Sequence, residues 1–194
     1  GKPHIAIEYL NSWGIDEIAL VDIDATPEKR GPLTEKISAY SRHCQVPLAV
    51  GGGITTVEQM KQLVHAGADK IIINTAAIKN PKLIIEGAWL FGNQCIVVSI
   101  DVLRHSSGEY EVFSNSGKTA TGKSPVELAK IAEASGAGEI MLNSINRDGS
   151  KIGYDLGLLE RVVKAVSIPI IVCGGVSHPK HFLEAMKYDV SAVA

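Results

Sequence analysis

The sequence predicts an α/β domain with the architecture of a (β/α)8 TIM barrel, a single domain over residues 1–194. Short apolar runs alternate with longer segments of helical periodicity, a pattern typical of parallel strands joined by helices. The apolar runs are continuous, which indicates strands buried on both faces. An internal repeat at an offset of about 122 residues then indicates how many βα units the fold contains.

The expected strands cover residues 17–22, 46–50, 69–74, 95–100, 139–143, 168–172 and 190–194. Helical spacing predicts helices between them at residues 56–66, 81–89 and 124–135. Ser124 and Pro125 supply the cap and first position of the last of these helices, and Gly67 and Gly136 follow helix ends. The polar segment 102–123 contains a candidate hairpin strand, Glu109–Phe113. Trp13 and Trp89 lie in helical stretches and are expected to pack.

Three ungapped matches carry the repeat. GIDEI (14–18) aligns with GAGEI (136–140), VPL (46–48) with IPI (168–170), and GGI (52–54) with GGV (174–176). Two copies of four βα units give the eight of a barrel. The strand equivalent to residues 95–100 in the other copy of the repeat would precede Gly1. The chain ends at Ala194, before the residue equivalent to Asn74. We therefore expect a barrel that lacks its first strand and its C-terminal end.

Composition excludes several classes of partner. A formal charge of −2 gives no reason to expect nucleic acid or a membrane surface. Three distant cysteines predict neither a disulfide framework nor a zinc site, and the six histidines show no metal-ligand spacing, so we expect no metal and no cofactor. No signal peptide or long apolar run is evident, and we expect a cytoplasmic protein.

Polar and small residues follow the expected strands, where barrel enzymes place their chemistry. Gly51–Gly53 and Gly174–Gly175 come after apolar strands and before helices, as in loops that hold phosphate through backbone N–H groups. The alternative is that these glycines relieve crowding. Because the repeat puts the two loops on opposite sides of the barrel, we expect a substrate with a phosphate at each end.

Charged residues mark both ends of the strands. Asp101 follows strand 95–100 and would project into the barrel mouth as a general acid or base, with a helix cap or loop ion pair as the alternative. Glu17, Lys70 and Glu139 begin strands and would meet at the opposite end. From the residues alone, a structural ring of salt bridges is the favoured interpretation of these three.

Five segments carry a family resemblance: VGGGI (50–54), GADKIIINTAAI (67–78), FGNQCIVVSID (91–101), GAGEI (136–140) and NRDGSKIGYD (146–155). Over essentially all 194 residues the chain resembles the HisF family, the cyclase subunits of imidazole glycerol phosphate synthase. The sister isomerase family HisA shares the half-barrel repeat, but the FGNQ and KxGYD types of segment look like HisF.

The resemblance implies a lyase of histidine biosynthesis that works with HisH, a glutamine amidotransferase. Ammonia would enter at the N-terminal face and cross the barrel core. At the mouth it would convert a bis-phosphorylated ribulosyl-formimino aminoimidazole carboxamide nucleotide to imidazole glycerol phosphate and aminoimidazole carboxamide ribotide.

The resemblance also implies residue roles. Asp101 corresponds to one aspartate of a catalytic pair, and the other belongs to the missing first strand. Glu17, Lys70 and Glu139 correspond to a charged ammonia gate, which reverses the preference for a structural ring. Phosphate contacts correspond to two groups of residues, Gly53, Asn74 and Thr75 on one side and Asp148, Gly149 and Gly175 on the other.

The sequence departs from the histidine-pathway pattern at five strand-end positions, Asp24, Ile72, Asn143, Asn146 and Cys173, where threonine, serine, threonine, aspartate and serine are usual. These departures leave an alternative open. A second branch of HisF-like proteins, encoded with surface-polysaccharide genes, is thought to deliver ammonia for sugar amidination. A third hypothesis is a phosphate-binding barrel without catalysis.

Overall fold

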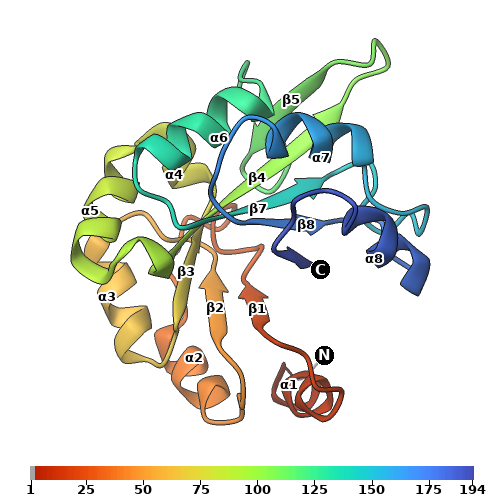
Figure 1. Cartoon of the computed structure of the whole chain (residues 1–194). Coiled ribbons are helices and arrows are strands. Elements are labelled where there is room, and N and C mark those ends of the chain that lie inside the picture. Colours follow the sequence, from red (N-terminus) through yellow and green to blue (C-terminus); the bar gives the residue numbers. More distant parts are fainter. Residues whose placement is uncertain (1–2) are drawn as a thin grey trace.

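A computed structural model describes residues 3–194. Seven parallel strands form a curled sheet in the order β1-β2-β3-β4-β7-β8-β9, and helices cover its convex face (Figure 1). This arrangement confirms the predicted α/β barrel class. The seven strands are β1 (Ile18–Val21), β2 (Leu48–Gly51), β3 (Lys70–Ile73), β4 (Ile96–Arg104), β7 (Glu139–Ser144), β8 (Ile170–Cys173) and β9 (Ala192–Val193).

The helices follow the strands around the outside of the sheet. Those at the predicted positions are α3 (Val57–His65), α5 (Lys82–Phe91) and α6 (Pro125–Ala134). The sequence analysis gave no bounds for the other five helices, although it placed Trp13 in a helical stretch and expected a helix after Gly174–Gly175. These helices are α1 (Pro3–Ser12), α2 (Thr34–Ser41), α4 (Thr75–Lys79), α7 (Leu156–Val163) and α8 (Pro179–Ala185). The short helix α4 matters most for function, because it begins directly after β3 at the edge where the candidate site lies.

The α6 helix begins and ends as its sequence predicts. The Ser124 hydroxyl accepts a hydrogen bond from the backbone N–H of Glu127 at 3.1 Å, and Pro125 occupies the first helical turn, where its missing N–H costs nothing. Gly136 follows the C-cap with φ +93°, a left-handed conformation that glycine adopts without strain.

The core has two layers because strand side chains alternate between the faces of the sheet. Outward residues such as Ile71, Ile96 and Ile140 are buried against the helices. Burial of each such side chain contributes about 1.5–3 kcal/mol. Inward residues form a smaller apolar cluster of Ala49, Ile72 and Val97, with Met141 packed against it.

The strand β4 is longer than predicted. It runs through Asp101 to Arg104, because its end pairs with the antiparallel strand β5 (Tyr110–Ser114), which confirms the candidate hairpin. A short third strand, β6 (Thr119–Ala120), pairs with β5. Figure 1 shows this hairpin extending beyond the C-terminal ends of the neighbouring strands.

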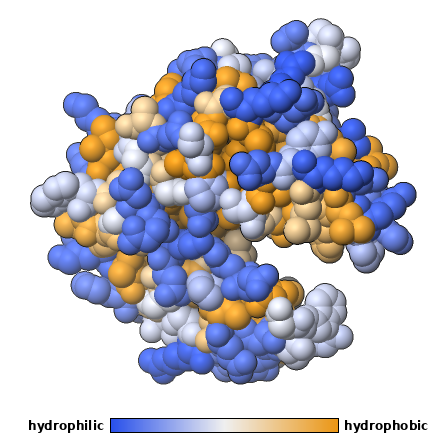
Figure 2. Space-filling view, viewed as in Figure 1, coloured by the Kyte–Doolittle hydropathy of each residue, from blue (hydrophilic) through white to orange (hydrophobic). Residues whose placement is uncertain are grey.

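Both tryptophans are largely exposed, which contradicts the expectation that they serve packing. Trp13 lies just after α1 and contacts the Tyr9 ring at 5.1 Å between centroids, and Trp89 projects from the outer face of α5. Hydrophobic residues also line the walls of the hollow seen on the side of β1 and β9 (Figure 2).

Candidate functional site at the mouth and floor of the sheet

The C-terminal ends of the strands surround a cavity of about 1110 Å³. Parallel strands end at the same edge of a sheet, so residues far apart in the sequence meet there. Five predicted site residues line this cavity: Gly53, Asn74, Thr75, Asp101 and Asp148. Gly149 and Gly175, which were predicted to contact the second phosphate of the substrate, do not line the cavity.

Asp101 occupies an inward-facing position of β4. It lies in register with Asn143 on β7, which in turn is in register with Cys173 on β8. The Asn74 amide donates to Asp101 Oδ2 at 2.8 Å, and the Asn143 amide donates to Oδ1 at 3.1 Å. Among residues 3–194, no lysine or arginine forms an ion pair with Asp101, and the side chain does not cap a helix.

Burial raises the pKa of the Asp101 carboxyl above its usual value, because removal from water disfavours the charged form. The hydrogen bonds from Asn143 and Asn74 act in the opposite direction, and the nearby charge of Asp148 raises the pKa further. A half-buried carboxyl with a raised pKa holds a proton more readily than an exposed one, which suits it to general acid–base catalysis.

The first glycine loop lies against the loop that follows β1. Gly53 has φ +68°, and a Cβ atom there would lie 2.5 Å from the Arg30 carbonyl oxygen. Crowding therefore explains the glycine, although Gly53 also faces the cavity. Three lysines, Lys29, Lys79 and Lys118, line the same cavity and add positive charge suited to an anionic ligand.

The loop between β5 and β6 closes one side of this cavity, which the sequence analysis missed. The Ser116 hydroxyl donates to the Ile23 carbonyl at 3.0 Å, and the Asn115 N–H donates to Thr75 Oγ1 at 2.9 Å. Asn115, Ser116 and Gly117 all have positive φ. The run of Asn, Ser and Gly is the signal that could have indicated this tight turn.

The second glycine loop packs against the segment that precedes α7. Gly175 has φ +97°, and its carbonyl accepts a hydrogen bond from the Gly153 N–H at 2.7 Å. Among Asp148, Gly149 and Gly175, only Asp148 lines the cavity. The structure therefore brings both sets of residues predicted to bind phosphate to the same edge of the sheet, but only part of the second set to the cavity.

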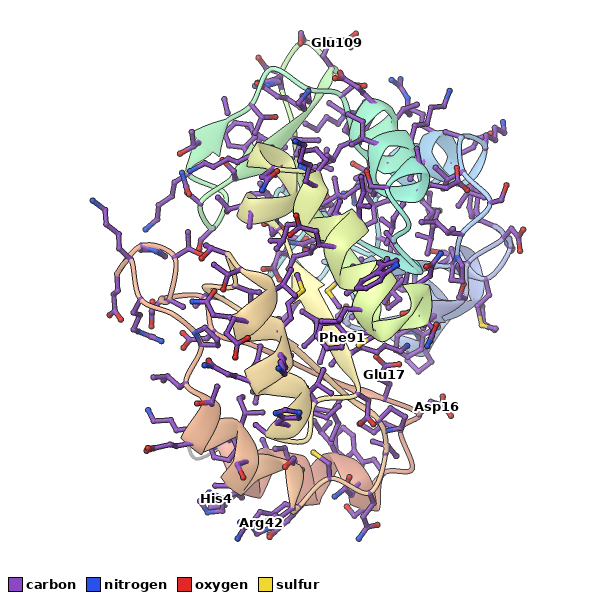
Figure 3. The ribbon with its side chains drawn as sticks, turned by 90° about the vertical axis from the view of Figure 1, so that its left-hand side faces the viewer. His4, Asp16, Glu17, Arg42, Phe91 and Glu109 are labelled. Atoms are coloured by element: carbon purple, nitrogen blue, oxygen red, sulfur yellow. The ribbon has the colours of Figure 1, made fainter. Side chains whose placement is uncertain are left out.

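The opposite end of the strands carries a compact charged cluster, which we call the floor triad: Glu17, Lys70 and Glu139. Lys70 Nζ donates to Glu17 Oε2 and to Glu139 Oε1, each at 2.7 Å. Figure 3 labels Glu17 far from Glu109, which belongs to the β4–β5 hairpin at the mouth end. The structure thus joins the three charged residues that the sequence placed at the N-terminal face.

The two glutamates of the floor triad stabilise the charged form of Lys70. Burial disfavours the charge on Lys70, but hydrogen bonds and attraction from Glu139 and Glu17 outweigh burial and raise the pKa of Lys70. Glu139 Oε2 is buried and accepts no hydrogen bond from the described residues. Toward the mouth, Ile72 of the inner apolar cluster follows Lys70 by two residues on β3, and Met141, which packs against that cluster, follows Glu139 by two residues on β7.

The structure shows the surroundings of three positions that depart from the expected family pattern. Ile72 belongs to the inner apolar cluster. Asn146 donates to the Arg104 carbonyl and accepts from its N–H, a two-way pairing that aspartate could not make. Burial, with the charges of Asp101 and Asp148, raises the pKa of the Cys173 thiol to about 12, so this thiol is not an activated nucleophile at neutral pH.

No helix among residues 3–194 has both the length and the apolar character needed to cross a membrane. In the same part of the chain, no group of three or more His, Cys, Asp or Glu side chains is arranged to hold a metal ion.

The fold defines the class of protein: an α/β barrel with a polar, partly acidic mouth at the C-terminal ends of its strands and an ion-paired floor. The chain belongs to the family described as "Histidine biosynthesis protein", which matches residues 1–194. It is 45% identical over 187 residues to a protein of Bacillus cereus, covering 96% of this chain and 74% of that protein. It is 44% identical over 195 residues to a protein of an Exiguobacterium species, covering 100% of this chain and 76% of that protein. Both relatives are named imidazole glycerol phosphate synthase subunit HisF.

Proposed function

We propose that this chain carries the cyclase activity of an imidazole glycerol phosphate synthase. Ammonia and a bis-phosphorylated ribulosyl-formimino aminoimidazole carboxamide nucleotide would be converted to imidazole glycerol phosphate and aminoimidazole carboxamide ribotide. The names of the relatives support this reaction. The structural observation that carries the proposal is Asp101, a carboxyl with a raised pKa held at the mouth by two amides.

Asp101 is proposed as a general acid–base residue. Ring formation and release of the ribotide both require protons to move between nitrogen and oxygen atoms. A carboxyl whose pKa lies closer to neutral than usual can accept a proton in one step and return it in another. Its predicted aspartate partner is not among residues 1–194.

The phosphate groups of the substrate are proposed to bind at the two glycine loops. Gly53, Asn74 and Thr75 would hold one phosphate, and Asp148, Gly149 and Gly175 would surround the other. The positive side chains of Lys29, Lys79 and Lys118 on the cavity support the first site. The Asp148 N–H already donates to the Ser144 carbonyl at 2.9 Å, and its carboxylate would repel a phosphate, so Asp148 would instead accept a hydrogen bond from a substrate hydroxyl.

The floor triad is proposed as an ammonia gate. Neutral ammonia is small and crosses an apolar layer far more readily than ammonium does, because a charge loses its hydration there. The apolar side chains of Ile72 and Met141, which follow Lys70 and Glu139 toward the mouth, suit such a passage. The partner that supplies ammonia is proposed to be a HisH-like glutamine amidotransferase docked on this face, in keeping with the subunit names of the relatives.

The test uses ammonium chloride in place of glutamine, so that no partner is needed. The purified full-length protein, which includes the strand expected to carry the partner aspartate, should release imidazole glycerol phosphate from the bis-phosphorylated nucleotide. Asp101→Asn keeps the side-chain shape and should abolish this turnover while the circular dichroism spectrum stays unchanged. Retained turnover in the folded variant would remove Asp101 from the mechanism.

The substitutions at the mouth, among them Asn143 and Cys173, favour a second candidate, ammonia delivery for sugar amidination. In that case the folded protein would not turn over the nucleotide. Substituting Lys70 should still uncouple glutamine hydrolysis from transfer, because both candidates need the gate. Gate variants with unchanged coupling would count against the channel in either case.

A further inference from the structure

The row of residues across β4, β7 and β8 contains an amide that the family resemblance does not assign. Asn143 lies between Asp101 and Cys173 in register, and all three line the mouth cavity. Its side chain donates to Asp101 Oδ1 at 3.1 Å. Asn143 is one of the positions at which the sequence departs from the pattern that the family resemblance implies.

The surroundings favour one orientation of the Asn143 amide. Gly174, with φ +94°, packs against its other end, and a Cβ atom at Gly174 would lie 3.0 Å from Asn143 Oδ1. The absence of a side chain at Gly174 therefore leaves room for the amide oxygen. An ionised carboxylate has only acceptors, so the amide nitrogen must face Asp101.

We propose that Asn143 is a positioning residue for Asp101. Together with Asn74 it fixes the orientation of the carboxylate, and its hydrogen bond stabilises the ionised form. The proposal rests on the proposed function of the mouth. Asn74, at the start of α4, donates to Oδ2, and Asn143, on β7, donates to Oδ1. The carboxylate is thus fixed from both neighbouring strands, which limits rotation of its side chain.

Hydrogen bonds to an ionised carboxylate stabilise the charge, whereas burial destabilises it. Loss of the Asn143 donor would leave burial less opposed and move the titration of Asp101 to higher pH. The other ionisable groups lining the cavity are Asp22, Lys29, Arg30, Lys79, Lys118, Asp148 and Cys173. Of these, the charge of Asp148 raises the pKa of Asp101, and the charges of Asp101 and Asp148 add to the raised pKa of the buried Cys173 thiol.

Two variants at this position and one matched control test the proposal. Asn143→Ala removes the donor, and Asn143→Asp replaces the donor with a like charge of the same shape. Ser144→Ala is the control, because Ser144 follows on the same strand, is buried on the opposite face and donates no side-chain hydrogen bond among the described residues. The readouts are the carboxyl carbon NMR titration of Asp101 and the pH dependence of kcat with ammonium chloride.

In Asn143→Ala, the Asp101 titration and the acid limb of the kcat profile should both move to higher pH, and they should move further in Asn143→Asp. Loss of positioning should also lower kcat about tenfold or more with KM for the nucleotide little changed. Ser144→Ala should match the wild-type protein. If Asn143→Ala does not fold, Asn143→Asp carries the test because it is isosteric.

An Asp101 titration that stays at its wild-type position in a folded Asn143 variant would overturn the proposal. The NMR titration needs no turnover, so it tests the role of Asn143 even if the protein proves inactive on the nucleotide. Inactivity of the wild-type protein would instead refute the proposed function. The two failures are therefore distinguishable.

Discussion

Replacing Lys70 with methionine tests the floor triad through stability. The change removes two ion pairs at 2.7 Å and leaves the carboxylates of Glu17 and Glu139 without their cation. Breaking a fully buried ion pair costs about 3–5 kcal/mol. The three side chains keep 19–28% of their exposure, so water offsets part of this loss, and we expect a cost of about 2 kcal/mol.

Urea unfolding followed by circular dichroism measures this cost. For a chain of this size, the expected loss corresponds to a fall in Tm of about 4–8 °C. Glu17→Gln with Glu139→Gln supplies the matched background, since Lys70→Met should cost much less once both carboxylates are neutral. An equal cost in the two backgrounds would refute the electrostatic reasoning and assign the effect to packing.

The pH dependence supplies an independent check of the sign. The pKa of Lys70 is raised on folding, so its stabilising effect is fully present below the unfolded value of 10.5. The effect is lost as pH rises through the folded pKa. The stability difference between wild type and Lys70→Met should therefore be constant at neutral pH and shrink only in strongly alkaline solution.

Three other changes have defined outcomes. Gly53→Ala should lower Tm more than Gly14→Ala, because both glycines have nearly the same positive φ but only Gly53 is crowded by backbone atoms. Added phosphate should also raise the Tm of Gly53→Ala less than it raises the Tm of wild type. Ser124→Ala should cost about 1 kcal/mol in urea unfolding through loss of the α6 cap, and an unchanged midpoint would contradict that role. Arg30→Gln should destabilise the protein at pH 7 but not in strong acid, because the hydrogen bond from Arg30 lowers the pKa of Asp22 and the benefit disappears as pH falls through that lowered pKa; a difference that persists in acid would rule out the ion pair as its cause.

The strands were predictable because their signal is local. Continuous β-branched runs such as residues 69–74 and 95–100 need burial on both faces, and the fold supplies it. The 122-residue repeat indicated the architecture without any contact information. The bounds of α2 and α8 could not be predicted, because these helices have only eight and seven residues and too few apolar positions to define a period.

The candidate site was predictable in position more than in detail. Strand order brings Asp101, Asn74 and Asp148 to one edge, and this follows from parallel strands alone. The donors to Asp101 could not be predicted, because they depend on the register between β4 and β7 and on the start of α4. The closure of the cavity by Ser116 depends on a tertiary contact across 93 residues of chain.

The most direct test of the account is turnover of the bis-phosphorylated nucleotide by the full-length wild-type protein and by its Asp101→Asn variant, with ammonium chloride as the nitrogen donor. The account predicts release of imidazole glycerol phosphate by wild type and none above background by the folded variant. Equal turnover by the two proteins would contradict the role of Asp101. No turnover by folded wild-type protein would contradict the proposed reaction itself.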